Sequence, residues 1–220
     1  MNRTHDDLLP FLADNYRRGG VVLIGAKDPV GLAIRECQRP LTPHKDRPSL
    51  WSHVFLFGEL RPTRRGLGQS VVRAPYIFES DLHFSFWTQQ LRNGAQENWV
   101  GKWCGDEVEH AAVLDFGLTA DEADRVLGMA LQLCDEEVQY PLGELVGTWF
   151  AMVTGRVWAP NPLDDPHAMY CSAFVRYCFA SAGKDFLPPA VASSNTAPEH
   201  IFIKAKVVAQ WDEAKDRPRH

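Results

Sequence analysis

The sequence predicts a single α+β domain in which an antiparallel sheet packs against a group of helices. Short apolar, β-branched runs bounded by turn residues indicate strands. Longer segments with apolar residues at spacings of three and four indicate helices. No repeat, low-complexity tract or linker divides the 220 residues, which are 45% hydrophobic and 23% charged. We therefore expect one domain, residues 1–220, with a substantial buried core.

Five segments are expected to be strands because each is short, apolar and flanked by glycine, proline or polar residues. They are 21–24, 52–57, 71–80, 111–116 and 201–209. The basic, glycine-bearing segment 61–68 is expected to be a hairpin loop. Loops are also expected at 38–50, 155–166 and 188–198, and the tryptophan-bearing region 87–103 has loop-like character.

Five helices are expected, at 6–16, 29–37, from Thr119 to before Pro141, at 142–153 and at 171–182. Thr119 and Glu122 form a capping-box pattern, in which each side chain bonds a free amide of the first turn. Ala123, Val126 and later apolar residues then recur on one helix face.

Composition argues against several classes of protein. The net charge of −5 argues against a nucleic-acid partner, because such proteins carry a basic face. Residues 1–20 lack the pattern of a secretory signal, and the most apolar stretch, 142–153, is too short to span a membrane. The expectation is a cytoplasmic protein without stable membrane insertion.

The chain has five cysteines and no C-x-x-C pair. An odd number without paired spacing argues against a disulfide framework and against a structural zinc site. Cys104 and His110 could be metal ligands, but no second pair supports them. We expect no metal and no cofactor.

Cys171 stands where a helix is expected to begin, in the segment Tyr170-Cys171-Ser172. The free amides and positive dipole end of a helix N-terminus favour a thiolate, which is the nucleophilic form of cysteine. The same amides can stabilise an oxyanion. We expect the Ser172 N–H to do so first, with Tyr170 nearby.

A reactive thiol needs a base, and His53 is the histidine that sits inside an apolar strand. Glu79 is a charged residue in the next apolar strand, so a hairpin would place it beside the second ring nitrogen of His53. Asp81, His83 and Asp115 are alternative acceptors. The other histidines stand in polar or loop surroundings and are expected at the surface.

The same residues also have interpretations that involve no catalysis. Cys171 could be a small core residue, His53 a hydrogen-bonded strand residue and Glu79 a solvated strand end. Five tryptophans have two possible roles: Trp87, Trp99, Trp103, Trp149 and Trp158. Several of them are expected in the core, while those in the region 87–103 could line an apolar substrate cleft. Arg61, Arg64 and Arg65 are expected in a solvated loop, or in contact with an anionic substrate.

The order of these elements resembles the circularly permuted branch of the NlpC-type papain-like cysteine hydrolases, in which the histidine strand precedes the cysteine helix. The resemblance covers roughly residues 19–209. It is carried by short segments in order: 20–24 (GVVLI), 33–35 (AIR), 52–54 (SHV), 78–80 (FES), 140–143 (YPLG) and 170–175 (YCSAFV).

The resemblance implies a papain-like core and a Cys171–His53–Glu79 triad. The expected activity is thiol-dependent hydrolysis of an amide or peptide bond, or of an ester, in a small peptide, amide or acyl-lipid substrate. One alternative is acyl transfer to a lipid or amine acceptor. Another is a catalytically silent binding module on the same fold, in which Cys171 and His53 would lie beyond contact distance.

Overall fold

The computed structural model describes residues 5–63, 72–85, 90–138, 170–189, 191 and 195–216. In these residues one antiparallel sheet forms in the order β4-β3-β2-β1-β5-β6. Its strands are β1 (Val21–Ala26), β2 (His53–Thr63), β3 (Val72–Ser85), β4 (Gln90–Trp99), β5 (Val108–Asp115) and β6 (Lys206–Asp212). The α+β class with an antiparallel sheet is confirmed.

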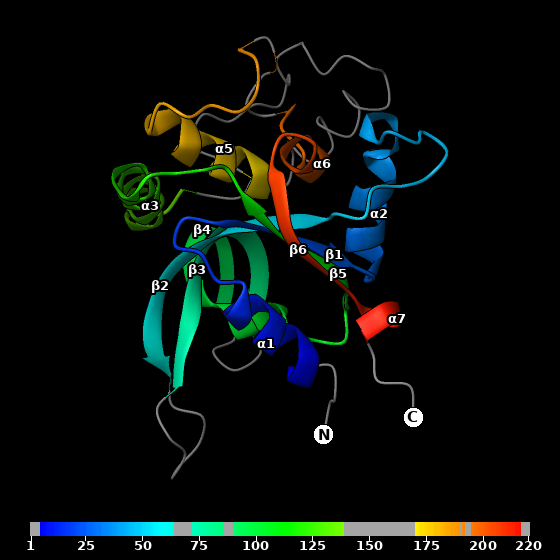
Figure 1. Ribbon diagram of the computed structural model, residues 1–220, viewed down its shortest axis with the longest axis horizontal. Helices are drawn as coiled ribbons and strands as arrows, with labels where there is room; N and C mark the ends of the chain where they lie inside the picture. The colour runs from blue at the N-terminus through cyan, green and yellow to red at the C-terminus, as the bar shows by residue number, and fades with distance from the viewer. Residues whose placement is uncertain are drawn as a thin grey trace.

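The helices connect these strands along the chain or flank the sheet (Figure 1). They are α1 (His5–Asp14), α2 (Pro29–Cys37), α3 (Ala120–Asp135), α5 (Cys171–Ser181), α6 (Pro198–Phe202) and α7 (Glu213–Asp216). Two short 3₁₀ turns, η1 (Arg39–Leu41) and η2 (Val100–Trp103), follow α2 and β4.

Two apolar layers hold the sheet between helices. Alternate residues of a strand face opposite sides, so Val54 and Leu56 of β2 pack toward α3 and α5. Phe55 and Phe57 pack on the opposite face, with α1 and η2. Figure 1 shows α3 and α5 on one side of the sheet and α1 on the other. Both faces of the central strands are therefore buried.

The capping box predicted at the start of α3 is confirmed. The Thr119 hydroxyl accepts from the Glu122 amide, and the Glu122 carboxylate accepts from the Thr119 amide at 2.9 Å. The apolar stripe behind it is buried, as its spacing predicts. The stripe is what packs α3 against α5 and the sheet.

Region 90–99 is a strand rather than a loop, which corrects the expectation from sequence. Its sequence has few of the β-branched and aromatic residues that favour strands. It is held instead by continuous pairing with β3, from Tyr76 opposite Trp99 to Ser85 opposite Gln90. β2 is also longer than expected and runs to Thr63, so Arg61 lies on a strand.

The last predicted strand begins later than expected. Residues 198–202 form α6, and β6 starts at Lys206 instead of residue 201. Pro198 opens the helix, where its missing N–H costs nothing, and the His200 ring accepts from the Ala197 amide at 3.0 Å. The expected helix at 142–153 and loop at 155–166 lie outside the described residues, as do residues 64–68 of the expected hairpin loop.

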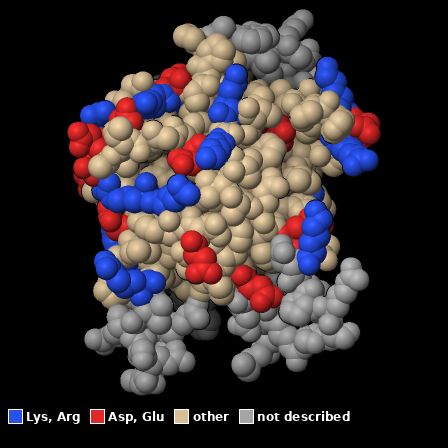
Figure 2. Space-filling model, viewed as in Figure 1, with Lys and Arg blue, Asp and Glu red and all other residues tan. Residues whose placement is uncertain are grey.

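Charged side chains of both signs are mixed on the face seen in Figure 2, where Lys and Arg lie beside Asp and Glu. Several charged side chains of the described residues form ion pairs, such as Arg18 with Glu59 and Lys184 with Glu122. None of the described helices is both long enough and apolar enough to cross a membrane.

Phe174 anchors α5 in the core, and its replacement tests this packing. Its side chain is fully buried among α3, α5 and the sheet, whereas Tyr177 of the same helix is 43% exposed. We expect Phe174→Ala to lower the free energy of unfolding by about 3–5 kcal/mol through lost contacts and a cavity. Tyr177→Ala should change it by less than about 0.5 kcal/mol. Equilibrium denaturation measures both values, and similar effects for the two variants would contradict this packing.

Candidate functional site

His53 and Glu79 meet on the sheet face that also carries Phe55. His53 is the first residue of β2, and its side chain shares the face of Phe55 because strand residues two apart point the same way. Its Nε2 lies 2.9 Å from Oε2 of Glu79, on the neighbouring strand β3. The His53 residue is 6% exposed and Glu79 is fully buried. The structure thus places Glu79 beside His53, as the sequence predicts.

The buried Glu79 carboxylate accepts hydrogen bonds from several donors besides His53. Oε1 accepts from Nδ2 of Asn98 and Nζ of Lys102, both at 2.7 Å. Oε2 accepts from Nε1 of Trp103, also at 2.7 Å. Burial raises the pKa of Glu79, but the His53 hydrogen bond and the Lys102 charge outweigh it and lower the pKa to about 2. Glu79 is therefore ionised at neutral pH.

Two of these donors come from η2, directly after β4. The Trp103 ring stacks on the His53 ring, with centroids 4.3 Å apart and an angle of 25° between the planes. Lys102 also bonds Oδ2 of Asp81 at 2.7 Å. Sequence reasoning does not identify Lys102 and interprets Trp103 as either a core residue or a cleft residue. Their link to Glu79 depends on the pairing of β4 with β3, and the polar sequence of β4 gives no strand signal that could have revealed it.

Cys171 is the first residue of α5, behind Tyr170, which has extended backbone angles and makes no side-chain cap. The Tyr170 carbonyl accepts from the Phe174 amide at 2.9 Å, which closes the first turn. Cys171 is 5% exposed, and its Sγ lies 3.8 Å from Oγ of the buried Ser172. The thiol therefore stands at the helix N-terminus as expected, where first-turn amides have no partner within the helix.

His53 links Cys171 to Glu79. Burial lowers the pKa of the His53 ring, but the charge and hydrogen bond of Cys171, and those of Glu79, outweigh it and raise the pKa to about 10. Because Nε2 faces Glu79, the other ring nitrogen is the one available to the thiol. The three side chains thus form a series of sulfur, imidazole and carboxylate.

The alternative acceptors for His53 lie elsewhere or are not described. Asp81 bonds Lys102. Asp115 is on β5, where it bonds Arg17 and the Gly117 amide. The side chain of His83 is outside the described residues.

The remaining cysteines differ from Cys171 in their surroundings. Burial raises the pKa of the Cys37 thiol, raises that of Cys134 to about 12 and raises that of Cys178 further above its usual value. Cys104 is fully buried and its thiol lies 3.8 Å from the Val100 carbonyl. Each of these environments disfavours the thiolate or access to it.

Two histidines correct the expectation that the rest lie at the surface. His200 is buried, and burial lowers its pKa to about 4. His110 is half-buried between Glu109 and Asp212, at 3.3 and 3.4 Å. Within the described ranges, no group of three or more His, Cys, Asp and Glu side chains is arranged to hold a metal ion.

The predicted substrate-contacting residues are only partly described. Trp103 packs on His53, and Trp99 ends β4. Arg61 bonds Glu97 at 2.8 Å and lies over the Tyr76 ring. Trp87, Trp149, Trp158, Arg64 and Arg65 lie outside the described residues.

Comparison with known proteins gives a likeness in fold. No protein-family model matches the sequence, and no curated protein matches it. Among solved structures, the chain is similar to the metalloprotein yiiX from Escherichia coli O157:H7, a protein described as DUF1105. The TM-score is 0.54 at 12% identity, over 90% of this chain and 98% of that chain. At this identity the likeness shows that the two chains share a fold.

Proposed function

We propose that this protein is a cysteine hydrolase with a papain-like core in circularly permuted order, which cleaves an amide or peptide bond, or an ester. The observation that carries the proposal is the series formed by Cys171, His53 and Glu79. A nucleophile that contacts a base, which in turn is oriented by a carboxylate, is the arrangement typical of covalent catalysis. The chain order supports the permuted arrangement, since β2 and β3 precede α5.

The proposed reaction begins with attack of the Cys171 thiolate on the substrate carbonyl carbon. A bond forms from sulfur to carbon, and the carbonyl π electrons move onto oxygen. The Ser172 amide, with Tyr170 nearby, stabilises that oxyanion. The bond to the leaving nitrogen or oxygen then breaks as His53 gives its proton to the leaving group.

The second half of the reaction regenerates the thiolate. A water molecule attacks the acyl-enzyme and gives a proton to His53, and the carbon–sulfur bond breaks to release the acid. Glu79 stabilises the imidazolium and holds the ring orientation throughout. The substrate class is a small peptide, amide or acyl lipid, and the chemistry uses side chains of this chain alone.

The alternatives make different demands on the same residues. Acyl transfer needs the same acyl-enzyme and an acceptor in place of water. A tryptophan-lined cleft would favour it, but Trp103 is engaged with His53 and Glu79. A silent binding module expects Cys171 and His53 to lie apart, whereas the charge and a hydrogen bond of Cys171 are among the causes that raise the pKa of His53. We therefore favour hydrolysis.

Selective alkylation tests the nucleophile without a known substrate. At neutral pH we expect iodoacetamide to label Cys171 before the other thiols, because burial raises the pKa of Cys37, Cys134 and Cys178. His53→Ala should slow the labelling of Cys171 by about tenfold or more through loss of the ion-pair partner. Peptide mass spectrometry measures the rate at each site. Preferential labelling of Cys37 or Cys104 would count against the assignment.

Turnover of a panel of amide, peptide and ester substrates tests the reaction itself. We expect Cys171→Ala to lower kcat on the order of a thousandfold or more, because the covalent route is lost. Glu79→Gln should lower it by about a hundredfold, since the imidazolium loses its anionic partner. Cys178→Ala serves as the control thiol variant and should retain activity after correction for folded protein.

Two outcomes of the same assay distinguish the alternatives. Product that carries an added amine or lipid alcohol instead of water would favour acyl transfer. Turnover of the panel by Cys171→Ala at the wild-type rate would refute the proposed nucleophile.

A further inference from the structure

The indole of Trp103 contacts both the base and the acid of the candidate triad. Its ring stacks on the His53 ring, with centroids 4.3 Å apart and an angle of 25° between the planes. Its Nε1 donates to Oε2 of Glu79 at 2.7 Å, and the same oxygen lies 2.9 Å from Nε2 of His53. A carboxylate oxygen can accept two hydrogen bonds in this way. A side chain outside the triad therefore touches two of its members.

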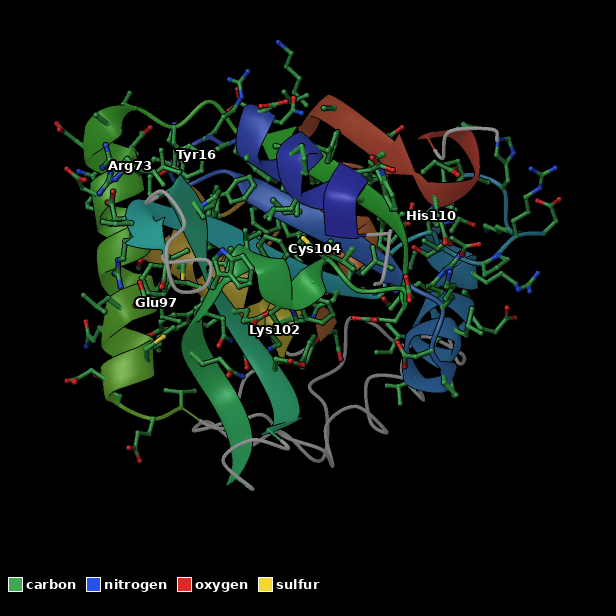
Figure 3. The ribbon with its side chains drawn as sticks, turned by 90° about the horizontal axis from the view of Figure 1, so that it is seen from below. Tyr16, Arg73, Glu97, Lys102, Cys104 and His110 are labelled. Carbon is green, nitrogen blue, oxygen red and sulfur yellow. The ribbon has the colours of Figure 1, made fainter. Side chains whose placement is uncertain are left out.

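The turn η2 holds the indole in place. Trp103 is its last residue, and both Val100 at its start and Cys104 after its end are fully buried in the apolar layer. The Cys104 amide donates to the Gly101 carbonyl at 3.2 Å and closes the turn. Figure 3 shows Lys102 and Cys104, the two neighbours of Trp103 in the chain, where η2 lies against the sheet. The position of Trp103 is thus fixed by its flanking residues as well as by its own contacts.

The His53 ring needs such a contact, because its hydrogen bond to Glu79 alone would leave the ring plane free to turn. The torsion about the Cβ–Cγ bond of histidine is broad and has no single narrow preference. A hydrogen bond at Nε2 fixes that nitrogen but not the plane of the ring. The stacked indole supplies the missing restraint, since rotation of the ring would lose the stacking contact or clash with Trp103. With both contacts in place, the nitrogen that does not face Glu79 keeps one direction.

We propose that Trp103 is a positioning residue, which holds the His53 ring in the orientation that presents its second nitrogen to Cys171. The inference rests on the proposed function, because it takes Cys171 and His53 as the reacting pair. Trp103 acts through the two triad members that it contacts, His53 and Glu79. Misplacement of a reacting group by about 1 Å can lower a rate about a hundredfold, so loss of this restraint should lower kcat.

The stacking contact and the hydrogen bond of Trp103 can be removed separately. Trp103→Phe keeps a flat ring beside His53 but removes the N–H donor. Glu79 then still accepts from Asn98 and Lys102 through its other oxygen. Trp103→Leu removes both contacts and keeps an apolar side chain. If the ring orientation of His53 depends on the stack, phenylalanine should preserve most of what leucine loses.

The NMR signals of the His53 ring test this geometry in the full chain without substrate. The ring current of an aromatic side chain shifts protons that lie over its face upfield, so the carbon-bound ring protons of His53 should resonate upfield in the wild type. We expect Trp103→Leu to abolish this upfield shift and Trp103→Phe to retain most of it. His53→Ala assigns the signals, because they disappear in that variant.

Trp211→Phe is the matched control, because Trp211 is a buried indole of the same apolar layer and its Nε1 makes no hydrogen bond within the described structure. This variant should leave the His53 signals and kcat unchanged. If Trp103→Leu does not fold, Trp103→Met offers a longer, unbranched apolar side chain without a flat ring and is expected to give the same loss. An upfield shift that persists in whichever of these two variants folds would overturn the inference.

Turnover of the substrate panel distinguishes positioning from a purely structural role. We expect Trp103→Leu to lower kcat by about tenfold to a hundredfold, after correction for folded protein, with KM nearly unchanged. Trp103→Phe should recover most of the lost kcat. A change confined to KM, or a phenylalanine variant no better than the leucine variant, would contradict the proposal.

The two proposals fail in different ways. If iodoacetamide labels Cys171 in His53→Ala as fast as in the wild type, the proposed function fails, because the thiol does not depend on its partner. If His53→Ala slows labelling but Trp103→Leu keeps both the upfield shift and the wild-type kcat, the proposed function stands and the role of Trp103 is wrong.

Discussion

A carboxylate buried in the sheet constrains the rest of the site. Removing a charge from water costs several kcal/mol unless hydrogen bonds and an opposite charge replace the lost solvation. Glu79 meets this demand with donors from three other elements: β2, β4 and η2. Its burial therefore fixes the path of the chain after β4, because η2 must return to the same face. The turn η2, which looks like a loop in sequence, is held by these contacts together with the burial of Val100.

The same constraint explains why the site lies at the end of a strand. His53 and Glu79 are on the sheet face that packs against η2, whereas α5 packs on the opposite face. A side chain in mid-strand would be separated from α5 by the sheet. His53 is the first residue of β2, and its ring is influenced by both Glu79 and Cys171. The location of His53 in its strand is what joins the two layers.

Sequence reasoning predicted the parts of this arrangement that are local. A histidine and a glutamate in apolar strands stand out because charged residues there need partners, and Cys171 stands out at a helix start. Lys102 and Trp103 could not be found this way, because their contacts depend on the pairing of β4 with β3. The polar sequence of β4 gives no strand signal of its own. The α6 helix was missed for a different reason, since its cap is local but unusual: the His200 ring accepts from the Ala197 amide three residues earlier.

The cysteines show that charge, rather than exposure, selects the candidate nucleophile. Exposure alone would favour Cys37, which is half-buried, over Cys171, which is 5% exposed. Burial without a cation makes a thiolate costly, and this accounts for the raised pKa values of Cys37, Cys134 and Cys178. At Cys171 a cation is close by, because the His53 ring, which Glu79 contacts, has its pKa raised to about 10. The proposed function depends on this neighbour, since it gives a shielded thiol a cationic partner within the fold.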